Sequence, residues 1–258
     1  MTPTSPLKEF AILAGGLLAI VVGLYLLLGL AVDWVAPRIP VQVEKKIAVP
    51  FLRTIGPAKA DTPRRRYLQR LVDALQSHCA HLPYRVKVHI LKAPAVNAVA
   101  FPGGNIVVFS GLLQKVASEN ELVFVLAHEL GHYSHRDHLR ALGRGLLLVA
   151  LSTVLLGSDS AIGKLLVDTL GLTQMRFSRA QENRADAYAL ESLQCIYGHV
   201  RGAVGFFARI PKSHDPGGLG HFFASHPGNR RRIAHLKALA QKKGFVTGPL
   251  VPLPAGFR

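Results

Sequence analysis

Residues 122–132 read LVFVLAHELGH, and this stretch decides the fold. Its first six residues, Leu122–Ala127, are all apolar, which predicts a buried helix that continues into the polar residues behind them. His128 and His132 are four apart, so they lie on one face of that helix with Cβ atoms about 5–6 Å apart, and both imidazoles can bind one ion. Burial of two histidines and Glu129 is unfavourable unless they are paired or bound to metal. The stretch therefore predicts a metal site on a buried helix.

Glu129 adds chemistry to this predicted site. It stands beside His128, where its carboxylate can contact a metal-bound water rather than the metal and can take its proton as a general base. The pattern His-Glu-x-x-His on a helix is typical of zinc metallopeptidases. The sequence therefore predicts Glu129 as the catalytic base and Zn2+ as the cofactor, one ion per chain.

A third protein ligand is expected, because catalytic zinc sites usually take three and leave one position for water. His138 lies six residues after His132, which is the spacing of the longer metzincin motif, but His135 stands where that motif has a glycine. A metzincin-like peptidase that uses His138 is therefore one alternative.

Glu182 is the other candidate, in the stretch SRAQENRAD at residues 178–186. Glu182 and Asp186 are four apart, so on a helix they share one face. Glu182 can then bind the metal while Asp186 accepts the free N–H of a metal-bound histidine, expected to be His128, and fixes its orientation. The spacing favours Glu182 over His138.

The N-terminal part of the chain predicts a membrane anchor. Phe10–Val32 holds no charge, and as a helix of about 34 Å it can cross a hydrocarbon core of about 30 Å. It is longer than the apolar region of a signal peptide, and Trp34 follows it at the expected interface. We expect residues 1–36 to be a single-pass anchor in the plasma or inner membrane. Basic residues after the span weakly favour a catalytic part in the cytoplasm, so the side of the membrane that holds it stays open.

The rest of the chain predicts a linker and one domain. Four prolines, at 37, 40, 50 and 57, predict an irregular linker or collar over residues 37–61. Residues 62–258 predict a metallopeptidase domain of the α+β class, mostly helical, with a small β-hairpin or sheet. Its expected elements are a helix from Thr62-Pro63, a strand at Arg85–Leu91, a hairpin of Val96–Phe101 and Asn105–Ser110, and helices from Gly111 to about Lys243.

A second apolar stretch, Gly145–Ser158, is too short to span a bilayer unaided. Apolar residues continue with helical spacing to Leu170, so we expect a helical hairpin over residues 145–170. Burial in the core and contact with the membrane both remain open for it.

Composition limits the partners. The chain has 31 Lys and Arg against 15 Asp and Glu, a net charge of +16, and a mean hydropathy of +0.26. A basic surface of this kind favours anionic membrane lipid. The sequence lacks the motifs of nucleic-acid-binding folds, so no nucleic acid is expected. Cys79 and Cys195 allow one disulfide or two free thiols, which leaves the redox compartment open.

Four blocks of the sequence carry a resemblance to known proteins. They are Asn97–Gly104 followed by Ile106–Leu113, His128–His132 with Arg136 and His138, Ser178–Asp186, and Ser225–Pro227 with Arg230. Together they resemble the membrane-linked zinc metallopeptidases of the HtpX-like and CAAX prenyl protease type. The resemblance implies a zincin-like domain with Glu182 as the third zinc ligand. Gly228 follows the last block where relatives often have a second proline, which leaves the subfamily open.

Two further sets of residues take roles from this comparison. His226 is expected to be catalytic, either as a donor to the developing oxyanion or as a group that touches the metal in a resting state. Asn105–Ser110 is expected to be an edge strand that pairs with an extended substrate chain, and an ordinary core hairpin is the alternative that the sequence leaves open. The substrate-binding residues are then Asn97, Asn105, Ile106 and Val107.

These observations predict a membrane-anchored zinc metalloendopeptidase whose partners are protein or peptide substrates, unfolded or membrane-associated, and membrane lipid. A rival is a zinc-stabilised, chaperone-like membrane protein that binds clients and hydrolyses little. Glu129 argues against that rival, since a structural zinc site needs no base beside its ligands.

Overall fold

The computed structural model describes residues 5–55, 62–79, 82–156, 177–209, 226 and 229–257. Helices dominate, one small sheet is present, and the predicted α+β class is confirmed. The elements are α1 (Pro6–Val35), a 3-10 helix η1 (Ala36–Arg38), α2 (Val41–Ile55), α3 (Pro63–His78), β1 (Lys87–Leu91), β2 (Ala98–Phe101), β3 (Asn105–Phe109), α4 (Ser110–Lys115), α5 (Glu119–Ser134), α6 (Asp137–Leu156), α8 (Arg179–Tyr197), α9 (Gly205–Arg209) and α11 (Asn229–Lys242).

The sheet has the strand order β1-β3-β2. β3 pairs with β1 in parallel and with β2 in antiparallel fashion, and the turn between β2 and β3 uses Gly103 and Gly104 at positive φ. The expectation that Asn105–Ser110 forms an edge strand is therefore wrong. A hairpin alone leaves both strands at an edge, but β1 comes from before the hairpin and pairs with the outer side of β3.

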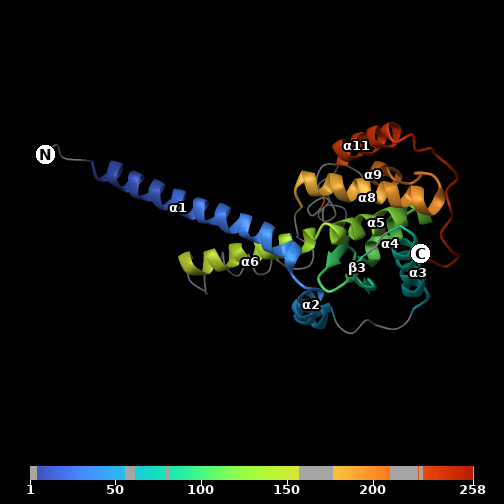
Figure 1. Cartoon of the computed structure of the whole chain (residues 1–258), viewed down its shortest axis with the longest axis horizontal. Coiled ribbons are helices and arrows are strands. Elements are labelled where there is room, and N and C mark those ends of the chain that lie inside the picture. The colour runs from blue at the N-terminus through green and yellow to red at the C-terminus, as the bar shows by residue number, and fades with distance from the viewer. Residues whose placement is uncertain are drawn as a thin grey trace.

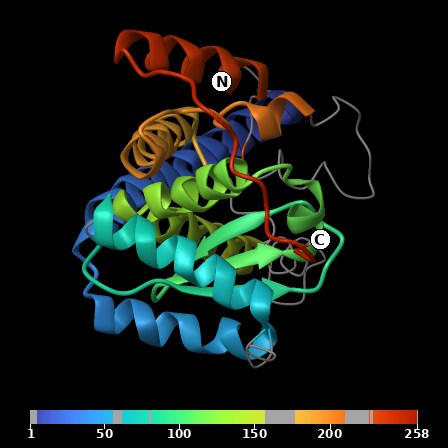
Figure 2. The same cartoon turned by 90° about the vertical axis from the view of Figure 1, so that its right-hand side faces the viewer.

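The core surrounds α5, which is buried along almost its whole length. Its glycine, Gly131, lets α8 approach closely, because a Cβ there would lie 2.9 Å from the Cα of Ala185. Viewed end-on in Figure 2, α11, α8 and α5 follow one another above the sheet, and α2 lies on the opposite side. The predicted metal-binding helix is thus the centre of the domain.

A disulfide joins Cys79, after the end of α3, to Cys195 near the end of α8. The sequence left this pairing open. The bond links two helices that flank α5 and closes a loop of 116 residues in the chain.

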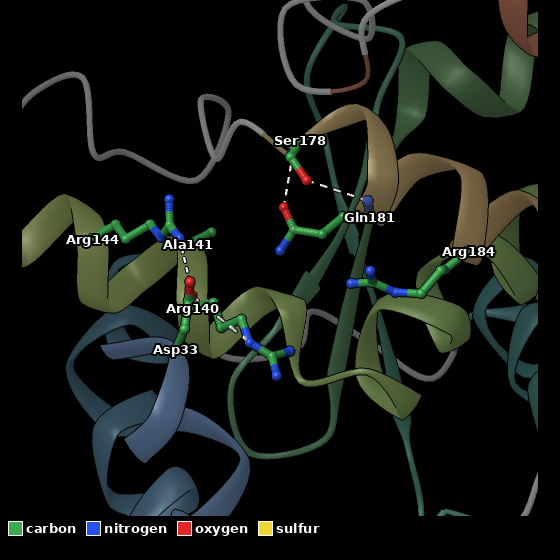
Figure 3. Close-up of a pocket in the computed structure, with 7 residues that line it drawn as sticks. All are labelled: Asp33, Arg140, Ala141, Arg144, Ser178, Gln181 and Arg184. Atoms are coloured by element: carbon green, nitrogen blue, oxygen red, sulfur yellow. Dashed lines mark hydrogen bonds and ion pairs between the residues drawn. The ribbon is translucent and has the colours of Figure 1, made fainter. Parts of the chain in front are cut away.

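Helix α1 extends away from the domain, and α6 lies alongside it (Figure 1). α1 is long and apolar enough to cross a membrane, with a mean hydropathy of 2.6 and no buried part in that window. The two helices approach closely at Gly143, whose Cβ would lie 2.7 Å from Val32, and an ion pair joins Arg144 to Asp33 at 2.5 Å (Figure 3). The second half of the predicted hairpin, 157–170, lies outside the described residues.

Residues 41–55, predicted as irregular linker, form helix α2. The backbone carbonyl of Pro40 accepts bonds from the N–H groups of Val43 and Glu44, so this proline precedes the helix where its missing N–H costs nothing. The sequence alone does not distinguish a proline that precedes a helix from a proline in a loop, which is why a linker was predicted here. Glu44 is fully buried, which ties α2 to the domain.

Candidate metal centre

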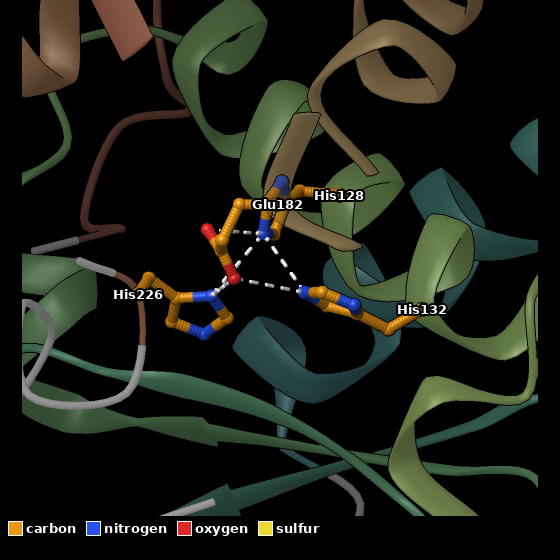
Figure 4. A group of neighbouring side chains, drawn as sticks. All are labelled: His128, His132, Glu182 and His226. Atoms are coloured by element: carbon orange, nitrogen blue, oxygen red, sulfur yellow. Dashed lines mark hydrogen bonds and ion pairs between the residues drawn. The ribbon is translucent and has the colours of Figure 1, made fainter. Parts of the chain in front are cut away.

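Helices α5 and α8 and residue 226 bring four metal-ligating side chains together (Figure 4). Ligand atoms of His128, His132, Glu182 and His226 all lie within 4.8 Å of one another, and all four residues are buried. Among the described residues His138 is outside this group, because its Nε2 lies 2.9 Å from Glu44 Oε1. The geometry therefore does not support the metzincin-like alternative.

The spacing of the four groups suits one small ion. Nε2 of His128 lies 3.1 Å from Nε2 of His132, and Nε2 of His132 lies 3.5 Å from Oε1 of Glu182. His226 Nδ1 lies 3.2 Å from His128 Nε2 and 2.9 Å from Glu182 Oε1. Tetrahedral bonds of about 2.0–2.1 Å place ligand atoms about 3.3 Å apart. Nitrogen and carboxylate oxygen are also the donors that zinc takes in catalytic sites.

Glu129 points to the same centre from the sheet side. Its Oε2 accepts a hydrogen bond from the backbone N–H of Ala100 at 2.7 Å. Its Oε1 is buried, accepts no hydrogen bond among the described residues, and lies 3.6 Å from His226 Nε2. Burial raises the pKa of Glu129. One oxygen is thus fixed by the backbone and the other is available to a water at the centre.

Two carboxylates contact the outer nitrogens of the two α5 histidines. Asp186 Oδ1 lies 3.0 Å from Nδ1 of His128, the partner that the sequence predicted. Asp137 Oδ2 lies 3.3 Å from Nδ1 of His132, and the sequence analysis missed it. Asp137 follows the end of α5, where Arg136 takes a positive φ of 58° and turns the chain back. Because Asp137 lies beyond this turn, helical spacing does not predict its contact with His132.

Arg232, the last of three consecutive arginines on α11, is buried beside two carboxylates of α8. Its Nη2 lies 2.5 Å from Asp186 Oδ1 and its Nη1 lies 2.9 Å from Glu182 Oε2. Burial opposes the ionisation of Asp186, yet the Arg232 charge outweighs it and lowers the pKa of Asp186 to about 2. Arg232 therefore balances the two α8 carboxylates.

The pKa values of the two α5 histidines are shifted in opposite directions. Burial and the nearby Arg232 lower the pKa of His128 to about 3. Burial also opposes the charged form of His132, but its hydrogen bonds with Asp137 and Glu182 outweigh it and raise its pKa to about 9. Zinc binds the neutral imidazole, so the carboxylates that favour the charged form of His132 compete with metal binding at this residue.

The predicted substrate residues separate into two groups. Asn97 precedes β2, is buried, and has an Nδ2 with no hydrogen-bond partner among the described residues. Asn105, Ile106 and Val107 lie on the central strand β3 with neighbours on both sides, so their backbone groups cannot pair with a substrate chain. Among the described strands, the outer edges of the sheet belong to β1 and β2, each of which has a strand on only one side.

Comparison with known proteins matches this site to one family. Residues 62–240 match the model of Peptidase family M48. The chain is 28% identical over 175 residues to metalloprotease YcaL of Escherichia coli, covering 66% of this chain and 67% of that protein. It is 33% identical over 170 residues to the mitochondrial metalloendopeptidase OMA1 of Arabidopsis thaliana, covering 65% of this chain and 33% of that protein.

A third relative is the beta-barrel assembly-enhancing protease of Escherichia coli, 27% identical over 156 residues, 55% of this chain and 32% of that protein. The chain thus spans two thirds of YcaL but only about a third of the other two. The family match confirms the predicted class of enzyme, a zinc metallopeptidase of the membrane-linked HExxH type. Since the matched region is most of the sequence, the chain belongs to Peptidase family M48.

Proposed function

We propose that this chain is a membrane-anchored endopeptidase that holds one Zn2+ between His128, His132 and Glu182 and hydrolyses peptide bonds in unfolded or membrane-associated proteins. The observation that carries the proposal is the single buried cluster in which these three side chains lie at zinc-ligand spacing. Glu129 beside them carries a buried oxygen that accepts no hydrogen bond among the described residues. A purely structural zinc site has no use for such a base.

In the proposed reaction Glu129 takes the proton of the attacking water and passes it to the leaving amine. The backbone N–H of Ala100 holds the other oxygen of Glu129 and keeps the carboxylate aimed at the centre. A bound zinc ion supplies Lewis-acid polarisation of the scissile carbonyl and lowers the pKa of the attacking water. Asp186 and Asp137 orient the two α5 histidines through their outer nitrogens.

His226 takes a role on the metal side in this proposal. Its Nδ1 lies 2.9 Å from Glu182 Oε1, within the ligand cluster. A fourth protein ligand closes a zinc site, whereas catalysis needs an open position for water. His226 would therefore hold the site in a resting state and leave it when substrate enters.

The membrane part of the proposal rests on α1, which is long and apolar enough to span a bilayer. One relative is named as a protease that enhances β-barrel assembly, and others are mitochondrial enzymes. We propose a plasma or inner membrane for this chain, with protein substrates at its surface.

The test compares purified wild type with Glu129→Gln and His132→Ala in detergent, measuring bound zinc and cleavage of casein. We expect about one zinc per chain in both wild type and Glu129→Gln. The rate of casein cleavage should fall by at least about 100-fold in Glu129→Gln, because the general base is lost. His132→Ala should bind zinc weakly, because it lacks a ligand. Wild-type zinc without any cleavage would favour the client-binding rival, and no zinc would refute the proposal.

His226→Ala separates the two roles of that residue. If His226 closes the resting site, the variant should cleave casein at least as fast as wild type and bind zinc less tightly. If His226 instead stabilises the oxyanion, the rate should fall while zinc affinity stays unchanged.

A further inference from the structure

A polar pocket of about 410 Å3 lies outside the metal centre, where α1 meets α6 and the start of α8 (Figure 3). Three of its lining side chains are arginines, and Asp33 is the carboxylate among the lining residues. The side chains of Arg144 and Arg184 are 48% and 45% exposed, and that of Arg140 is 22% exposed, so solvent reaches all three side chains. The lining residues are Asp33, Arg140, Ala141, Arg144, Ser178, Gln181 and Arg184.

The pocket lies at the level where two apolar helices become polar. The charge-free run of α1 ends at Val32, directly before Asp33. The apolar run of α6 begins at Gly145, directly after Arg144, and its Leu146, Leu148 and Val154 side chains are exposed. α6 runs back along α1 (Figure 1). A bilayer that surrounds the apolar part of α1 would place its phosphate layer at this pocket.

The charge of the pocket suits a single phosphodiester. Asp33 pairs with Arg144 at 2.5 Å, and its other oxygen lies 3.9 Å from Arg140. Asp137, buried behind the pocket, lies 3.4 Å from Arg140 and 3.2 Å from Arg184. Three guanidinium groups against two carboxylates leave one positive charge. Arginine binds phosphate oxygens in paired hydrogen bonds, and the N-terminal end of α8 adds a favourable dipole.

We propose that this pocket binds the head-group phosphate of an anionic phospholipid, such as phosphatidylglycerol. The membrane level of the pocket favours a lipid over a free phosphate. The net positive charge of the pocket favours a head group without an ammonium, since the cation of phosphatidylcholine would be repelled by that excess charge.

Such a lipid would contact the arginines that hold Asp137, and Asp137 contacts His132. The pocket and the metal centre therefore share one carboxylate. The binding itself does not depend on the proposed peptidase activity, so the two proposals fail separately.

The test is native mass spectrometry of the full chain in neutral detergent, titrated with phosphatidylglycerol, phosphatidylcholine or inorganic phosphate. The variant Arg144→Gln/Arg184→Gln removes two pocket charges. The control Lys237→Gln/Lys242→Gln removes two charges from exposed positions on α11. We expect one tightly held phosphatidylglycerol in wild type and control, and affinity at least about tenfold weaker in the pocket variant.

Three outcomes would overturn the proposal: equal affinity in the pocket variant, an equal loss in the control, or binding of inorganic phosphate with the same dependence on the arginines. The last would make the pocket a free-anion site. Arg144→Gln alone serves if the double variant unfolds, since the ion pair of Arg144 is with Asp33 at the surface. This single variant should also weaken phosphatidylglycerol binding, and unchanged affinity would count against the lipid site.

Discussion

His132 lies between two carboxylates, with Glu182 near its Nε2 and Asp137 near its Nδ1. Glu182 would share the metal with it, whereas Asp137 contacts only the outer nitrogen, Nδ1, at the ring edge. The same carboxylate that raises the pKa of His132 also holds the ring in the orientation that presents Nε2 to the ion. Asp137 is therefore one source of both the orientation and, together with Glu182, the proton affinity of His132.

Asp137→Asn tests that source. The variant keeps a hydrogen-bonding group of the same size but removes the negative charge that orients His132. We expect zinc affinity to fall by about 10–100-fold, as for other outer partners of zinc ligands, measured by competition with a chelating dye. Asp73→Asn is the matched control, because Asp73 pairs with Arg85 at the surface and should leave zinc affinity unchanged. Equal affinities in all three proteins would contradict this role for Asp137.

Arg232→Met tests the balance of charge behind the metal ligands. The variant leaves Glu182 and Asp186 buried without their cation, and removal of one partner of a buried ion pair costs about 3–5 kcal/mol. We expect a loss of unfolding free energy in this range, measured by denaturant titration of the zinc-free protein. Arg231→Met, at an exposed neighbouring position, should change it by no more than about 0.5 kcal/mol. Similar effects of both variants would show that the burial of Arg232 is not energetically important.

At the scale of elements, the local sequence pattern predicted the positions of helices well, but it did not predict which strands pair across long separations in the chain. The apolar run and the paired histidines placed α5, and Pro63 placed the start of α3. The central position of β3 in the sheet depends on its parallel pairing with β1, and the sequences of the two strands do not indicate that pairing. The burial and the contacts of Glu44 could not be predicted from the sequence either, since its partners lie about 40 to 94 residues away in the chain.

Glu44 ties helix α2 to the end of the active-site helix. Its carboxylate lies 2.9 Å from His138 Nε2 and 2.6 Å from Arg136 Nη1, and it accepts a hydrogen bond from the backbone N–H of Gly103 at 2.9 Å. Burial opposes ionisation of Glu44, but these partners outweigh it and lower its pKa below the ordinary value of 4.5. A carboxyl with a lowered pKa stabilises the folded state above its unfolded pKa and loses that contribution as pH falls below it.

Glu44→Gln should therefore destabilise the protein at neutral pH, and the difference from wild type should shrink as pH falls below about 4.5. The measurement is the denaturant midpoint of both proteins over a pH series. Glu191→Gln is the control, because Glu191 is exposed and pairs only with Lys243 among the described contacts. A difference that stays constant with pH would mean that Glu44 acts through its shape and not through its charge.

For the whole molecule, the disulfide and the charges after the apolar span predict different sides of the membrane for the catalytic domain. Basic residues after the apolar span lean weakly to a cytoplasmic domain, and large domains often cross regardless of such charges. The Cys79–Cys195 bond joins two helices of the catalytic domain. Disulfides persist in oxidising compartments and are rare where thiols are kept reduced. The domain is therefore expected on the oxidising side of its membrane.

Thiol labelling in cells that carry the full-length chain checks this orientation. Denatured extracts are treated with a maleimide polymer before or after reduction, and the shift in size of the chain is read on a gel. If the domain folds on the oxidising side, wild type should shift only after reduction, because both of its cysteines are in the bond. Cys79→Ser should shift without reduction, which shows that Cys195 can react once its partner is removed. A wild-type chain that shifts without reduction would place the domain in a reducing compartment and restore the orientation that the charges favour.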